Sequence, residues 1–141
     1  MYQRDYILRM IEMMGDFIAA ILKMLKKDQF PEVSRMIENA YFEFLKEDAA
    51  FFRGIPGENL TRELMEIHNY SHGHLEILGE LFYAEAELGY HSGKLNESLG
   101  YYKKSKLLLE FLLQESDTYS LNKEARMAEI QKKILTLEGK S

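Results

Sequence analysis

The amino-terminal stretch, residues 3–27, repeats polar and apolar residues at helical intervals. Its charged residues recur at steps of three, four and seven, and therefore line one narrow stripe: Asp5, Arg9, Glu12, Asp16 and Lys23. Nearly all other positions are apolar, whereas an ordinary surface helix has an apolar arc of roughly 100°. We therefore expect this helix either to be the central helix of the fold or to pack against a second copy of the protein. Gly15, which costs a helix interior about 1 kcal/mol relative to alanine, predicts close approach of another helix.

Apolar residues recur at helical spacing in five further segments. Pro31 suits the first position of a helix that we expect to continue to about Phe52, and the Gly-Ile-Pro-Gly sequence after Arg53 is the clearest break. The later helices are predicted at about residues 60–69, 72–91, 95–115 and 120–137. Ser71 is a candidate cap for the second of these four, and whether residues 60–91 form one helix or two stays open.

The fold class that follows is all-α, because no stretch alternates with the period of two that a strand requires. With 141 residues the chain has the length of one domain. We expect five to six helices, arranged as a first hairpin at about residues 3–52, a second at about 60–115 and a capping helix at about 120–138.

Composition favours a soluble cytoplasmic protein. The chain has no cysteine, which excludes disulfides, thiolate metal sites and cysteine nucleophiles. Charged residues interrupt the amino terminus, so neither a signal peptide nor a span of about 20 apolar residues is expected. Residues 38–87 hold eleven acidic and three basic residues. This excess argues against a nucleic-acid partner, because phosphate contacts need clustered lysine and arginine.

Residues 81–110 resemble a tetratricopeptide repeat, a helical hairpin of about 34 residues in which small side chains lie where the two helices touch. The residues that carry the likeness are Phe82, Ala86, Gly93, Ser98, Tyr102 and Ser105. Glu85 stands where the repeat has an apolar residue, and Gly89 where it has an aromatic one. Residues 28–33 and Ala40 repeat part of the pattern, which extends the resemblance to the first hairpin. The whole chain also resembles members of an uncharacterised bacterial family of short all-helical proteins, a likeness that implies no activity.

The resemblance implies a non-enzymatic scaffold that binds protein or peptide, because tetratricopeptide proteins bind peptides on a concave face. Two hairpins are fewer than the three repeats that a solenoid usually needs. A compact bundle and an open superhelix therefore remain alternatives, and a homodimer through residues 3–27 would supply the missing neighbour.

The stretch HNYSHGHLE, residues 68–76, holds three of the four histidines and is the alternative candidate site. Two histidines four residues apart on a helix can bind zinc. On a continuous helix, however, His68 and Glu76 would lie about 12 Å apart, too far to share one ion. If Ser71 caps the following helix, His68 lies outside it. We therefore predict no metal and no cofactor, and keep a metal- or small-molecule-binding bundle using His68, His72 and His74 as the alternative.

Other signatures of catalysis are absent. The sequence has neither a phosphate-binding loop nor a nucleophile elbow, so no catalytic residue is predicted. The abundant carboxylates are expected to face solvent on amphipathic helices. Apolar residues on the first helix and beside the Gly-Pro loop are the predicted interaction surface: Met10, Met14, Phe17, Phe51, Phe52 and Ile55.

Overall fold

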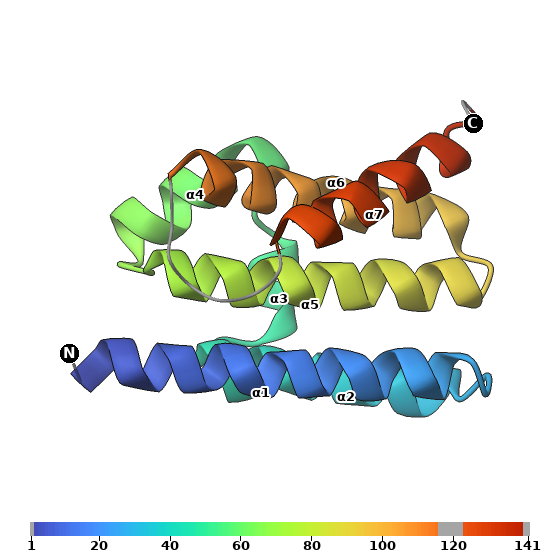
Figure 1. Ribbon diagram of the computed structural model, residues 1–141, viewed down its shortest axis with the longest axis horizontal. Helices are drawn as coiled ribbons and strands as arrows, with labels where there is room; N and C mark the ends of the chain where they lie inside the picture. Colours follow the sequence, from blue (N-terminus) through green and yellow to red (C-terminus); the bar gives the residue numbers. More distant parts are fainter. Residues whose placement is uncertain (1, 116–122, 140–141) are drawn as a thin grey trace.

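The computed structural model describes the backbone of residues 2–115 and 123–139, with side chains from Arg4 onward. Every regular element in these residues is helical and none is a strand, so the all-α prediction is confirmed (Figure 1). The elements in chain order are α1 (Tyr2–Leu25), α2 (Phe30–Leu45), α3 (Ala49–Arg53), η1 (Gly57–Asn59), α4 (Leu60–Arg62), η2 (Glu63–Ile67), α5 (His72–His91), α6 (Leu95–Gln114) and α7 (Lys123–Leu137).

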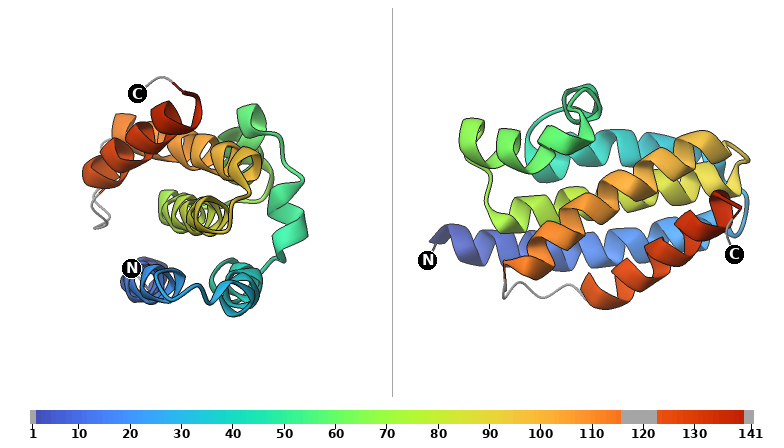
Figure 2. Two further views of the ribbon diagram at one scale, coloured as in Figure 1. Left: turned by 90° about the vertical axis from the view of Figure 1, so that its right-hand side faces the viewer. Right: turned by 90° about the horizontal axis from the view of Figure 1, so that it is seen from above.

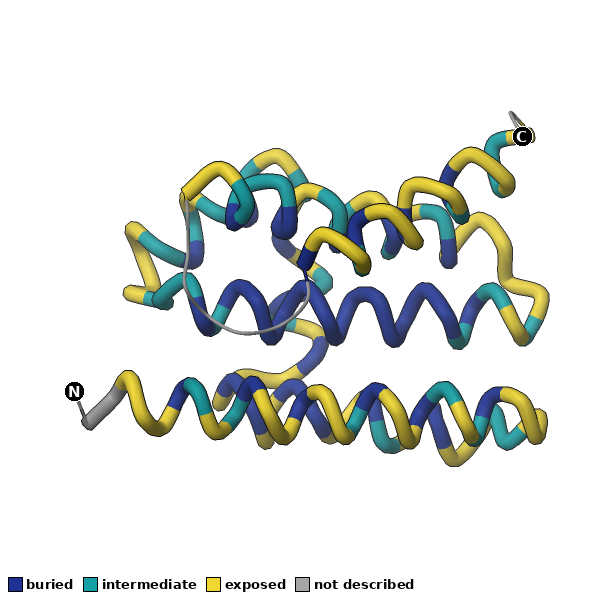
Figure 3. Tube along the Cα trace, viewed as in Figure 1, coloured by how far each residue is buried: buried dark blue, intermediate teal, exposed yellow. Residues whose placement is uncertain are grey.

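The central helix is α5. It runs between α1 and α2 on one side and α6 and α7 on the other (Figures 1 and 2). Fifteen of its 20 residues are buried, whereas each neighbouring helix keeps an exposed face (Figure 3). A helix buried on all sides is usually apolar on all sides. Because α5 also carries glutamates, its central position brings charged side chains into the interior.

Of the two alternatives for the first helix, the central position is wrong, because α5 occupies it and α1 buries a single face. The buried residues of α1 recur at steps of four and three: Ile7, Ile11, Met14, Ile18, Ile21 and Leu25. Outside that face, Tyr6 is 41% exposed and Met13 is 47% exposed. A Cβ added at Gly15 would meet no atom of another described helix within 4 Å, so no other helix of the described chain approaches closely at this position.

The helix predicted from Pro31 to about Phe52 is interrupted. After α2 ends, Lys46 adopts a left-handed backbone conformation with a φ of 67°. Asp48 then caps α3, because its side chain accepts a hydrogen bond of 3.0 Å from the backbone N–H of Phe51. Neither glycine nor proline marks this interruption, so the helical spacing of apolar residues continues through it and conceals it.

The turn between α5 and α6 joins two closely packed antiparallel helices. It contains Gly93, whose φ of 84° suits a residue without a Cβ. The hydroxyl of Ser98 donates a hydrogen bond to the carbonyl oxygen of Ala86 at 2.7 Å, and that of Ser105 donates to Gly79 at 2.8 Å. Both serines are fully buried. Small side chains therefore lie at the contact of the two helices, as expected from the spacing of Ser98 and Ser105 in the sequence.

Residues 60–91 form two separate helical segments. Between η2 and α5, Asn69 adopts a left-handed φ of 59°. Ser71 caps α5: its hydroxyl accepts from the backbone N–H of His74 at 3.3 Å, and its own N–H donates to Nδ1 of His74 at 3.0 Å. The predicted cap is thereby confirmed, and the pair is a capping box in which histidine takes the usual place of glutamate or glutamine.

The last helix, α7, packs along α6 (Figures 1 and 2). Its buried apolar residues recur at steps of three and four: Met127, Ile130 and Ile134. The predicted start of this helix at Ser120 lies outside the described residues.

Candidate functional site

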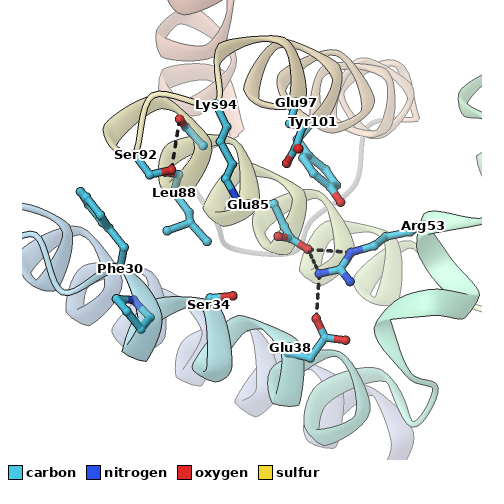
Figure 4. Close-up of a pocket in the computed structure, with 12 residues that line it drawn as sticks. Phe30, Ser34, Glu38, Arg53, Glu85, Leu88, Ser92, Lys94, Glu97 and Tyr101 are labelled. Carbon is cyan, nitrogen blue, oxygen red and sulfur yellow. Dashed lines mark hydrogen bonds and ion pairs between the residues drawn. The ribbon is translucent and has the colours of Figure 1, made fainter.

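A groove of about 590 Å³ lies between α2, the carboxyl-terminal half of α5 and the amino-terminal half of α6 (Figure 4). Its uncharged lining residues are Phe30, Pro31, Ser34, Leu88, Gly89, Ser92 and Tyr101, and its charged ones are Glu38, Arg53, Glu85, Lys94 and Glu97. A smaller hollow of about 230 Å³ shares three of these residues and adds Gly100 and Lys104. The two hollows together follow α6 for about three turns.

The charged floor of this groove, called here the Arg53 cluster, consists of Arg53, Glu85, Glu38 and Tyr41. Arg53 donates two hydrogen bonds to Oε2 of Glu85, from Nε at 3.1 Å and from Nη2 at 2.5 Å. The same Nη2 lies 3.0 Å from Oε1 of Glu38. The hydroxyl of Tyr41 donates to Oε2 of Glu85 at 2.9 Å. Glu85 is only 8% exposed, so its negative charge is compensated mainly by Arg53 and Tyr41.

Burial and the neighbouring Glu85 together shift the pKa values of Tyr41 and Arg53. Burial, and then the charge of Glu85 and the hydrogen bond to it, raise the pKa of Tyr41 far above its ordinary value. Burial alone would lower the pKa of Arg53, but the hydrogen bond to Glu85 and its charge outweigh burial and raise it. Tyr41 and Arg53 therefore keep their protons at neutral pH, and both act as permanent donors.

The wall formed by the start of α6 is positioned by Gly89. A Cβ at this position would lie 3.1 Å from the carbonyl oxygen of Lys94 and 3.1 Å from Cβ of Ser98. Because the nearest of these atoms belongs to the backbone, any larger residue would push α6 away from α5. The absence of a side chain at Gly89 therefore brings Lys94 and Glu97 to the rim of the groove.

On its other side, α5 presents three carboxylates to α7, and we call these contacts the α5–α7 ion-pair row. The contacts join Nζ of Lys123 to Glu76 at 3.5 Å, the guanidinium of Arg126 to both oxygens of Glu80 at 2.8 Å, and Nζ of Lys133 to Glu87 at 2.9 Å. The second and third pairs are each separated by 46 residues, as is the hydrogen bond from Tyr83 to Glu129. The two helices therefore run parallel in one constant register.

Solvent-facing carboxylates were expected throughout, and this expectation is wrong for four glutamates of α5. Glu76, Glu80, Glu85 and Glu87 are each at most 8% exposed. Each lies next to a cation from a segment at least 32 residues away in sequence, a distance that periodicity within one helix cannot detect. Arg53 and Glu85 were missed as site residues. The sequence feature that could have indicated Glu85 is its position, since it stands where the tetratricopeptide repeat has an apolar residue.

The three clustered histidines point to different neighbours. The ring of His68 meets the ring of Phe51 with centroids 4.9 Å apart, that of His72 meets Phe111 at 5.7 Å, and His74 belongs to the cap of α5. Burial lowers the pKa of His74, so its ring is neutral at pH 7. Within residues 2–115 and 123–139, no three histidine or carboxylate side chains are arranged to hold a metal ion.

The predicted interaction surface divides into two groups. Three of its residues are buried core residues, so their assignment to a surface is wrong: Met14, Phe52 and Ile55. The other three are partly buried and pack against the core: Met10, Phe17 and Phe51. Helical spacing identifies apolar residues but does not say which of them face outward when a helix is apolar over most of its circumference.

No family model matches this chain, and no curated protein and no solved structure is significantly similar to it. Among the described residues, no helix combines the length and the apolarity that crossing a membrane requires. The functional interpretation therefore depends on the geometry of the groove and of its charged floor.

Proposed function

We propose that this chain is a non-enzymatic, tetratricopeptide-like cytoplasmic scaffold that binds a peptide segment of a partner protein in the groove between α2, α5 and α6. The observation that carries the proposal is the groove itself, a concave site whose floor is fixed by the Arg53 cluster. Its volume of about 590 Å³ falls within the range of roughly 300–1,000 Å³ typical of ligand sites.

The lining of the groove suits a peptide. Phe30, Leu88 and Tyr101 are neither fully buried nor fully exposed, so they offer apolar surface that a ligand can cover. Charged groups stand among them and can fix the orientation of a bound chain. The resemblance to tetratricopeptide repeats supports the same reading, since α1–α2 and α5–α6 are successive helix pairs and α7 covers the second pair.

A pair of neighbouring residues on α2 provides a direct test. Ser34 is exposed and lines the groove, whereas Arg35 is exposed and does not. Peptides selected from a random displayed library on the full chain should lose at least about tenfold in affinity for Ser34→Trp, which fills the groove. They should bind Arg35→Trp as they bind the wild type. Failure to select any peptide, or equal binding to Ser34→Trp, would contradict the proposal.

We also propose that the scaffold is a homodimer through α1. The observation in favour is that α7 packs along α6, whereas α1 lies on the far side of α5 from both (Figure 1) and its Tyr6 and Met13 are exposed. Light scattering over a dilution series should show a dimer for the wild type and a monomer for Met13→Glu. A wild-type monomer at the highest concentration would remove this part of the proposal and leave the groove unaffected.

A further inference from the structure

The two carboxylate oxygens of Glu85 have different environments. Oε2 accepts three hydrogen bonds, two from Arg53 and one from Tyr41. Oε1 accepts none from any residue that the structure describes, although the side chain is 8% exposed and lines the groove. Figure 4 shows only one oxygen of Glu85 joined to Arg53, with the other directed toward the open part of the groove.

An acceptor in this position favours a ligand that brings a donor. An ionised carboxylate can accept hydrogen bonds at both oxygens, and a buried one loses much of its contact with water. A hydrogen bond from an ionised donor to such an oxygen is about twice as strong as a bond between neutral groups. The floor of the groove therefore presents one unused position for a strong hydrogen bond.

The charge balance selects the kind of donor. Two carboxylates, Glu38 and Glu85, share the single guanidinium of Arg53, so the Arg53 cluster keeps one net negative charge. On the rim of the same groove Lys94 and Glu97 carry opposite charges, and Lys104, which lines the adjoining smaller hollow, lies with Nζ 3.4 Å from the carbonyl oxygen of Arg53. Because a ligand in the groove would meet the second oxygen of Glu85 directly, a cationic donor is favoured there over a neutral one.

The walls of the groove suit the apolar part of a lysine or arginine side chain. Phe30 and Leu88 provide apolar surface for the methylene stem of lysine or arginine, and the ring of Tyr101 stands beside Arg53 and Glu97. Aromatic rings also attract cations that approach their faces.

From these four features we infer that the groove recognises a basic side chain of the partner peptide, with its ammonium or guanidinium group bound to Oε1 of Glu85. This inference rests on the proposed peptide-binding function and adds the residue that the peptide must carry.

The test uses the peptides selected on the full chain. They should contain lysine or arginine at one fixed position, and replacing that residue by norleucine, which keeps the stem without the charge, should weaken binding at least about tenfold. Glu85→Gln should weaken the unmodified peptide by a similar factor and the norleucine peptide hardly at all. The control is Glu80→Gln at another buried glutamate of the same helix, on the side of α7, which should leave both affinities unchanged.

A second variant keeps the test valid if Glu85→Gln does not fold. The side chain of Glu38 is 54% exposed, so Glu38→Gln should fold normally while removing the net charge of the cluster. It should reduce the preference for the charged peptide over its norleucine analogue by at least about threefold. Selected peptides that bind through Ser34 but show no basic position, or no dependence on Glu85 and Glu38, would overturn this inference and leave the proposed function intact. Selection of no peptide would overturn both.

Discussion

The two sides of α5 bury the same kind of residue in different ways. Toward α7, both oxygens of Glu80 are bound by Arg126, and the side chain is almost fully covered. Toward α2, Glu85 is held through one oxygen by Arg53 and Tyr41, and its second oxygen lies in the groove. A buried glutamate whose partners bind both oxygens only stabilises the fold. A buried glutamate whose partners bind one oxygen also leaves a hydrogen-bond acceptor for a ligand.

The largest effect is expected on the closed side. Arg126→Met leaves Glu80 buried without its bidentate partner, and removing one member of a buried ion pair typically lowers the free energy of unfolding by about 3–5 kcal/mol. Urea unfolding followed by circular dichroism measures this loss. Replacing both members, with Glu80→Leu and Arg126→Met together, should recover most of it, because no uncompensated charge is then buried.

The same substitution on the open side should cost less. Arg53→Met removes two hydrogen bonds to Glu85, but Tyr41 still donates to this carboxylate and water in the groove can reach its other oxygen. We expect a loss of about 2 kcal/mol in the free energy of unfolding. Equal losses for Arg53→Met and Arg126→Met in the same urea experiment would contradict the distinction between an open and a closed side.

Alkaline pH probes the tyrosines on both sides. Burial, followed by interactions with glutamates, raises the pKa of Tyr41 and of Tyr102 above 10, so the folded protein keeps protons that the unfolded chain releases. The stabilisation is fully present below pH 10 and is lost as pH rises from 10 toward the higher folded-state pKa. At pH 10.5 this linkage should lower stability by about 1 kcal/mol per tyrosine relative to pH 8. The pH dependence of unfolding should be shallower in both Tyr41→Phe and Tyr102→Phe.

The smallest effect is expected at the rim. Glu97 is exposed and lines the groove without belonging to its charged floor, so Glu97→Gln should change the free energy of unfolding by less than about 0.5 kcal/mol. A loss comparable to that of Arg53→Met would show that the rim and the floor of the groove form one structural unit.

Local patterns in the sequence predicted the helices well and their arrangement less well. The all-α class and the cap at Ser71 follow from spacing and from residue type, which are local properties. The break after α2 was missed because Lys46 adopts a left-handed conformation without being glycine. Such a conformation costs a lysine little enough for tertiary contacts to compensate it.

The central helix and the charged site could not be found in the same way. The apolar residues of α1 are more numerous than one face can bury, and the sequence does not say which of them pack inward. Conversely, α5 looks too acidic to be central until its cations are known, and these come from α3 and α7, 32 to 47 residues away. Ion pairs between distant segments form only in the folded chain, so the spacing of residues within one helix does not predict them.

The constant separation of 46 residues between Glu80 and Arg126 and between Glu87 and Lys133 has a consequence for sequence variation. Each residue turns a helix by about 100°. One amino acid inserted into α7 between Arg126 and Lys133 would therefore leave the contact of Arg126 with Glu80 in place and rotate Lys133 away from Glu87. Natural or engineered length changes within this part of α7 should therefore be rare unless an equal change occurs between Glu80 and Glu87.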